Sequence, residues 1–190
     1  MRKSGSIQRI LGFMPTDLII LAILIVAPGI VLPQTKPATD EDEVKAVFLF
    51  NFAQFVEWPP EAFQTADSPI VIGLLGRDPF GVYLEKTIEN EIVNGHPLVV
   101  ERYSSVKQIQ SCHILFINPG RTVKIESVLR SLKNKNILTV SNAADFTNQG
   151  GMIRFFNEDE KIKLEINLNA VKASNITISS KLLQLSEIVE

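Results

Sequence analysis

Residues 69–75 read Pro-Ile-Val-Ile-Gly-Leu-Leu, and this stretch decides the fold class. It is apolar from end to end, without the alternation of apolar and polar residues that marks a strand with one wet face. Uninterrupted apolar strands are typical of parallel sheets that are covered on both faces. Residues 113–117 and 137–140 have the same character and predict two further strands of this sheet.

A helix precedes the first predicted strand. Residues 44–58 have helical spacing, with Thr39 or Asp40 as the N-cap and Pro59-Pro60 as the stop signal. We expect Phe50 to be its least buried aromatic residue, which either packs under a neighbouring loop or contacts a partner. The expected core face consists of Val44, Phe48, Phe52 and Phe55.

The following segments continue to alternate between the two kinds of element. We expect helices over residues 79–91, 104–110 and 121–132, and a strand over residues 98–103. Strands that alternate with helices indicate an α/β fold with a mostly parallel sheet, right-handed crossovers and flanking helices.

The C-terminal part has a different pattern. Residues 152–156 and 162–166 are two predicted strands on either side of the polar turn 157–160, and the second strand alternates apolar with charged residues. This pattern predicts a C-terminal antiparallel hairpin added to the sheet. A helical turn over residues 169–173 and a last helix over residues 180–189 follow.

Hydrophobicity is concentrated near the N-terminus. The mean hydropathy of the 190-residue chain is +0.15, and the apolar stretch 18–32 is 15 residues long. Arg2, Lys3 and Arg9 precede it. This layout predicts that residues 1–33 are a signal peptide or an N-terminal membrane anchor, with a buried core helix as a third alternative.

Either of the first two interpretations places the rest of the chain across the inner membrane, in the periplasm. Residues 34–42 are then a linker and residues 43–190 a single α/β domain. The formal net charge of −2 becomes −4 without residues 1–33, because 19 bases lose three and 21 acids lose one. An acidic domain of this kind argues against a nucleic-acid binder of the basic-patch type.

The sequence carries no motif typical of catalysis, of a metal site or of a cofactor. Gly73, Gly76 and Gly81 lack the spacing of a dinucleotide-binding loop. Two histidines and one cysteine are too few for a zinc site, and no serine has a base at a spacing known from nucleophilic catalysis. We therefore expect no enzymatic activity, no catalytic residue, no metal and no cofactor.

Two single residues have alternative interpretations. Cys112 is either a small buried residue at the start of a strand or a reactive or intermolecular thiol. Asp78 is expected to cap the helix that begins at Pro79. Asp78 also follows the first strand of the sheet, where α/β folds bind ligands, so it is a candidate ligand-binding residue.

Several segments, taken together and in order, resemble the YfiR-like periplasmic family. The resemblance extends over about residues 43–189. The matching segments are 45–59 (KAVFLFNFAQFVEWP), 75–81 (LGRDPFG), 93–98 (VNGHPL), 112–117 (CHILFI), 138–141 (LTVS), 150–153 (GGMI), Phe155, 165–168 (EINL) and 178–183 (ISSKLL).

This resemblance implies a non-enzymatic regulator that restrains an inner-membrane diguanylate cyclase, lowering cyclic di-GMP and biofilm output, and that can form a homodimer. Relatives next to sensor kinases imply a kinase as the alternative partner. Many relatives join the cysteine before His-Ile-Leu-Phe to a cysteine in the first strand. Here Cys112 is kept but Gly73 stands at the other position, so the resemblance does not carry the redox-sensitivity of some relatives over to this chain.

Two hypotheses follow for the function. The first is a periplasmic module that binds and restrains a membrane signalling protein, with Phe50, Asn51, Trp58 and Phe80 as candidate contacts. The second is a sensor of a small molecule or cell-wall fragment that feeds a sensor kinase and uses the crevice near Asp78. Neither involves nucleic acid, and contact with the membrane is expected only through the N-terminal segment.

Overall fold

The computed structural model describes residues 39–120 and 124–190. The predicted signal peptide or anchor (1–33) and most of the predicted linker (34–42) therefore lie outside the described residues. Within the described part, no helix is both long and apolar enough to cross a bilayer.

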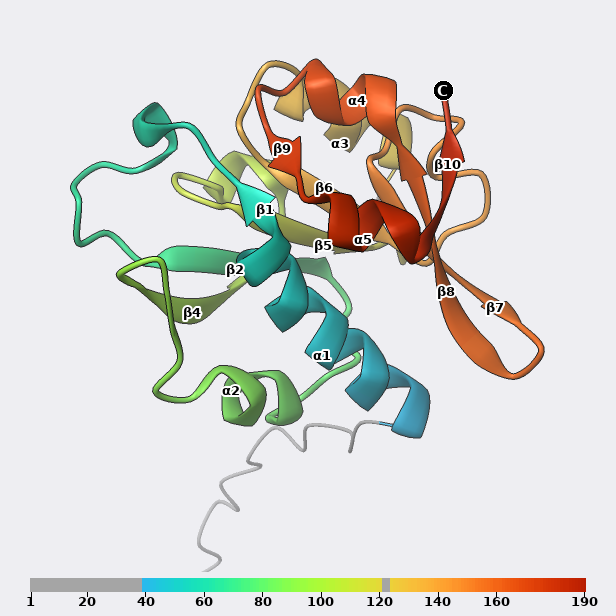
Figure 1. Ribbon diagram of the computed structural model, residues 1–190, viewed down its shortest axis with the longest axis horizontal. Coiled ribbons are helices and arrows are strands. Elements are labelled where there is room, and N and C mark those ends of the chain that lie inside the picture. The colour runs from blue at the N-terminus through green and yellow to red at the C-terminus, as the bar shows by residue number, and fades with distance from the viewer. Residues whose placement is uncertain (1–38, 121–123) are drawn as a thin grey trace, which may run out of the picture. The chain divides into compact units, whose positions relative to one another are not determined.

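An eight-stranded sheet, in the order β10-β8-β7-β6-β5-β2-β4-β3, forms the centre of the described part (Figure 1). A separate pair joins β1 (Val56–Glu57) to β9 (Thr177–Ile178). The strands of the large sheet are β2 (Ile70–Gly76), β3 (Ile92–Val93), β4 (His96–Tyr103), β5 (Ile114–Asn118), β6 (Leu138–Ser141), β7 (Ile153–Glu158), β8 (Lys161–Asn167) and β10 (Ser186–Val189).

The directions of the strands confirm the predicted fold class. Strands β4, β2, β5, β6 and β7 pair in parallel in that order, and β7 turns back antiparallel onto β8. The predicted mostly parallel core with a C-terminal antiparallel hairpin is therefore confirmed, and so is the α/β class. Strand β3 adds a short antiparallel edge beside β4.

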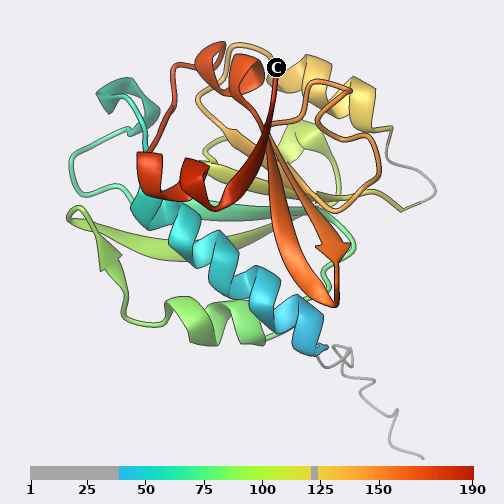
Figure 2. The ribbon, with the colours of Figure 1, turned by 45° about the vertical axis from the view of Figure 1, so that its right-hand side comes forward.

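Helices lie against both faces of this sheet (Figures 1 and 2). One buried cluster joins α1, α2 and α5 to Ile72, Ile114 and Leu138. A second cluster joins α3 to Leu115 and Ile117, which point to the opposite face. The helices are α1 (Asp40–Phe55), α2 (Tyr83–Ile88), α3 (Ile125–Leu132), α4 (Leu168–Lys172) and α5 (Ser180–Gln184), with short 3-10 turns η1 (Pro60–Ala62) and η2 (Val106–Gln108).

The predicted core face of the first helix is wrong in part. Thr39 caps α1 as expected, because its hydroxyl accepts a hydrogen bond from the amide of Asp42. Val44, however, is 46% exposed. The fully buried side of the helix, which faces the sheet, consists instead of Lys45, Ala46, Leu49, Phe52 and Ala53.

Small residues explain this rotation of the helix. Ala46 and Ala53 are completely buried, and their short side chains let the backbone of α1 approach the sheet closely. Lys45 buries its aliphatic stem while its ammonium pairs with Glu41. The bulkier Phe48 and Phe55 are displaced to the flank of the helix, where they are half-buried and pack against the core.

Two predicted helix ends are also wrong. The first helix stops at Phe55 rather than Trp58, because the backbone at Val56 becomes extended and pairs with Ile178 in β9. The predicted last helix ends at Gln184, and residues 186–189 form β10, parallel to β8. Ile188 and Val189 are β-branched residues that favour such an extended edge.

Cys112 is a buried, free thiol of the second cluster, which fits the first of its two interpretations. Burial raises the pKa of the thiol to about 12, so it is protonated and unreactive at neutral pH. Its neighbour on β2 is Gly73. A Cβ atom at Gly73 would lie 2.8 Å from Cys112 Sγ, and also 2.7 Å from Cε2 of Tyr103.

This proximity predicts that Gly73→Cys forms a disulfide with Cys112. The bond would close a loop of about 40 residues and contribute about 3–4 kcal/mol to the free energy of unfolding. Urea denaturation of the variant with and without dithiothreitol measures that difference.

Gly73→Ser is the matched control. It introduces the same crowding against Tyr103 without a bond, so we expect it to be destabilised and insensitive to dithiothreitol. A free thiol count of two in oxidised Gly73→Cys would contradict the predicted pairing.

Candidate functional site

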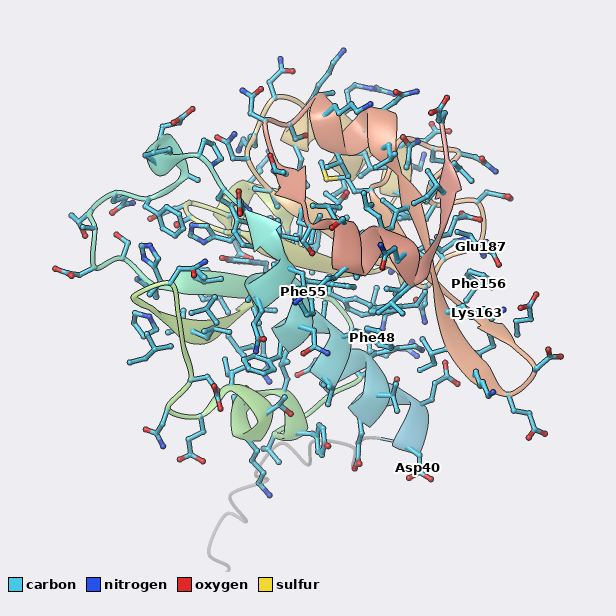
Figure 3. The ribbon with its side chains drawn as sticks, viewed as in Figure 1. Asp40, Phe48, Phe55, Phe156, Lys163 and Glu187 are labelled. Carbon is cyan, nitrogen blue, oxygen red and sulfur yellow. The ribbon has the colours of Figure 1, made fainter. Side chains whose placement is uncertain are left out.

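An open groove lies between α1 and the β8–β10 end of the sheet. It encloses about 420 Å³ and is lined by Phe48 from α1, by Ile162 and Leu164 from β8, and by Leu185 and Ser186 beyond α5. The Phe48 ring lies 5.8 Å from the Phe155 ring of β7. Figure 3 shows Phe48 on α1 and Lys163, Phe156 and Glu187 at this end of the sheet.

Exposed apolar side chains lie on the elements that line the groove, α1, β10 and the residue between α5 and β10. Leu185 is 72% exposed and Ile188 is 42% exposed. On α1, Val44 and Val47 are also exposed, and Asn51 is half-buried. Positions 44, 47, 48 and 51 share one side of a helix. We call the set Val44, Val47, Phe48, Asn51, Leu185 and Ile188 the α1–β10 surface.

The opposite face of the hairpin is charged and internally paired. Arg154 donates two hydrogen bonds, of 2.9 and 2.8 Å, to the carboxylate of Glu165. The guanidinium of Arg154 lowers the pKa of Glu165, so this pair remains ionised well below neutral pH. The Arg154 guanidinium also lies 4.9 Å from the centre of the Phe156 ring, and Lys163 pairs with Glu158.

Strand β10 is the outermost strand on this side of the sheet. It pairs with β8, and within the described residues no strand covers its other edge. Backbone amide and carbonyl groups along such an edge are free to pair with another chain. The α1–β10 surface therefore combines exposed apolar side chains with an open strand edge.

Trp58 lies elsewhere, in a cluster of aromatic rings and the two histidines of the sequence. Its indole Nε1 donates a hydrogen bond of 3.2 Å to the carbonyl of His113, and its ring meets the imidazole edge-on. Phe63 stacks on both His96 and His113, with ring centres 4.1 and 4.5 Å apart. Trp58 thus anchors the segment after α1 to the sheet and packs against the core.

His113 is held as a neutral imidazole in this cluster. Its Nδ1 accepts a hydrogen bond of 3.0 Å from the amide of Val71, which requires Nδ1 to be unprotonated. Burial lowers the pKa of His113 to about 4, and the neighbouring His96 lowers it as well. Protonation would place a proton between Nδ1 and the Val71 amide and break this contact.

Asp78 and Phe80 are both engaged within the protein. Asp78 is not the cap of α2, which begins at Tyr83; its carboxylate accepts hydrogen bonds from the amides of Phe80 and Gly81 and pairs with Arg102 at 2.8 Å. Phe80 is completely buried and meets Phe116 edge-on. Phe80 therefore belongs to the core and is not a surface contact in this structure.

The crevice expected at the carboxyl end of β2 is bridged by hydrogen bonds. Asn118 donates its side-chain amide to the carbonyl of Arg77 and accepts a hydrogen bond from the Arg77 amide. Gly76 has φ +97°, and a Cβ atom there would lie 2.3 Å from the carbonyl oxygen of Asn118. The loops after β2 and β5 therefore bind each other directly at this point.

The sequence-based candidates are thus scattered over the structure. Asn51 belongs to the α1–β10 surface, whereas Phe50 is half-buried and packs against the core on another side of α1. Leu185 and Ile188 were missed, because residues 180–189 were expected to form a helix in which they are two of the apolar residues. A weak local signal for an extended segment is the β-branched pair Ile188-Val189, which favours strand over helix.

Comparison with known protein families gives one match. A family model described as YfiR/HmsC-like matches residues 42–187, which is most of the chain. No curated protein matches the chain.

The geometry of His113 predicts a pH dependence of stability. The pKa of the His113 imidazole is about 6.5 in the unfolded state, whereas its pKa in the folded protein is about 4. Between these values the unfolded state binds more protons, so stability is full above pH 6.5 and falls as the pH is lowered through this window. We expect a loss of about 2 kcal/mol between pH 7 and pH 5 from His113, measured by urea denaturation.

His113→Gln removes this titration and should flatten the pH dependence over the same range. Ile114→Val is the control, because it weakens the same strand without removing a titrating group. An equally steep loss of stability in His113→Gln would assign the effect to other groups.

Proposed function

The chain belongs to the YfiR/HmsC-like family, and from this membership we propose that it is a non-enzymatic periplasmic regulator that binds and restrains a membrane signalling protein. The partner is an inner-membrane diguanylate cyclase, so the expected result of binding is a lower output of cyclic di-GMP. A sensor kinase is the alternative partner. Apart from the family membership, the main support for this proposal is the exposed α1–β10 surface.

The composition of this surface supports a protein partner. Interfaces between proteins have an apolar centre and a polar rim. Phe48, Ile162, Leu164 and Leu185 line the groove with apolar side chains, while Gln184 and Ser186 supply uncharged polar groups. The edge of β10 offers backbone groups that an extended segment of the partner can pair with.

Binding alone is sufficient for regulation. A partner that exchanges between an active and an inactive conformer shifts toward the conformer that the regulator binds better. A hundredfold preference for the inactive conformer shifts the equilibrium between them by up to about 2.7 kcal/mol. No residue of the regulator has to take part in chemistry.

The second hypothesis of the sequence, a ligand at Asp78, receives no support from the geometry around that residue. The Asp78 carboxylate is occupied by Arg102 and by two backbone amides. Arg102 also pairs with Glu85, so the three side chains form a closed set of charges. The proposed function therefore does not use Asp78.

A change of charge at the α1–β10 surface tests the proposal. Deletion of the gene should raise cellular cyclic di-GMP, and wild-type protein should restore the low level. Leu185→Glu should fail to restore it, because a buried carboxylate at an apolar contact weakens binding by a factor of about 10 or more. The readout is the cyclic di-GMP content of cells that contain equal amounts of each variant.

Ile92→Glu is the matched control. Ile92 is 67% exposed on β3, at the other end of the sheet, against 72% for Leu185. It should restore the low level fully. If deletion leaves cyclic di-GMP unchanged, the proposed partner class is wrong; if both variants act alike, the assignment of the surface is wrong.

A further inference from the structure

A second cavity lies between α3 and α4, which are neighbours at the top of Figures 1 and 2. It encloses about 580 Å³, within the range of about 300–1,000 Å³ that is typical of small-molecule sites. Its walls come from α3, the start of β6, the loop between β6 and β7, and α4. It is separate from the α1–β10 surface, with which it shares no lining residue.

Carboxamide side chains dominate the polar part of the lining. They are Asn134, Asn148, Gln149, Asn167 and Asn169. Asn167 is engaged in the fold, since it donates to the carbonyl of Thr147 and caps α4 through the amide of Ala170. The side chains of Asn134, Gln149 and Asn169 make no hydrogen bond within the described residues. Each carboxamide offers both a donor and an acceptor.

The inner wall of the cavity is apolar. Leu132, Ile137 and Met152 are buried residues that line it, and Leu129 stands half-buried beside them on α3. Such a wall suits the carbon–hydrogen face of a ring, whereas the carboxamides suit hydroxyl groups on its edge. The combination is unlike the α1–β10 surface, where the exposed side chains are mainly apolar.

The charge of the lining is positive. Arg130 and Lys133 contribute two cations, and Glu126 contributes one anion. Within residues 39–120 and 124–190, neither Arg130 nor Lys133 forms an ion pair. In an acidic domain, two free cations beside a cavity favour an anionic ligand, and an arginine matches the geometry of a carboxylate.

From these three features we propose that the cavity binds a small carboxylated sugar of the hexuronic-acid class. The ring lies against Leu129 and Met152, its hydroxyl groups exchange hydrogen bonds with Asn134, Gln149 and Asn169, and its carboxylate meets Arg130 and Lys133. This site is independent of the proposed docking function, because no residue is common to the two.

Saturation-transfer NMR of the full chain with sodium D-glucuronate tests the site. We expect binding with a dissociation constant of about 1 mM or tighter, and at least tenfold weaker binding of D-glucose, which lacks the carboxylate. Sodium acetate at the same concentration should not compete, because it lacks the ring and its hydroxyl groups. Absence of a glucuronate signal, or equal competition by acetate, would overturn the proposal.

Variants locate the binding. Arg130→Gln and Asn169→Ala should each weaken glucuronate binding at least fivefold, and neither side chain makes a hydrogen bond or ion pair in the described structure that its loss would break. Lys107→Gln is the control: Lys107 is exposed on η2, outside the cavity, and its loss should leave binding unchanged. Unchanged binding in both cavity variants would place any bound sugar elsewhere. Cyclic di-GMP levels play no part in this test.

Discussion

His113 is the junction on which the rest of the structure depends. Its amide donates a hydrogen bond of 2.9 Å to the carbonyl of Val71, and its Nδ1 accepts one from the Val71 amide. Its carbonyl accepts from the amide of Leu138 at 2.8 Å and from the indole of Trp58. One buried residue thus joins β2, β5, β6 and the segment after α1, and replacing it would leave several buried groups without partners.

The contacts of His113 also determine which side chains are exposed and can contact a partner. Trp58 and Phe63 are held against the two histidines, so these rings serve the fold. The same anchor fixes the end of α1, whose flank then carries Phe48 at the groove of β8 and leaves Val44 and Val47 exposed. The exposed apolar side chains of α1 are therefore a consequence of how its other side is packed.

The sequence predicts the centre of the fold better than its borders. Strands β2 and β5 are nearly continuous apolar runs, and β8 alternates, so their patterns allow few alternatives. The buried side of α1 could not be predicted from bulk alone, because Ala46 and Ala53 pack closest to the sheet. Residues 186–189 were mistaken for helix because their pairing with β8 is a long-range contact that no local pattern encodes. Trp58 and Phe80 were selected as candidate contacts for the same reason, since the residues that they pack against lie far away in the sequence.

The central claim is that the protein acts by docking through the α1–β10 surface. Hydrogen–deuterium exchange of the full chain, alone and with the periplasmic part of its membrane partner, tests this claim most directly. The account predicts slower exchange over residues 40–55 and 180–189 in the complex, with residues 58–63 and 76–81 unchanged. Protection of residues 58–63 or 76–81, with residues 40–55 and 180–189 unaffected, would contradict it.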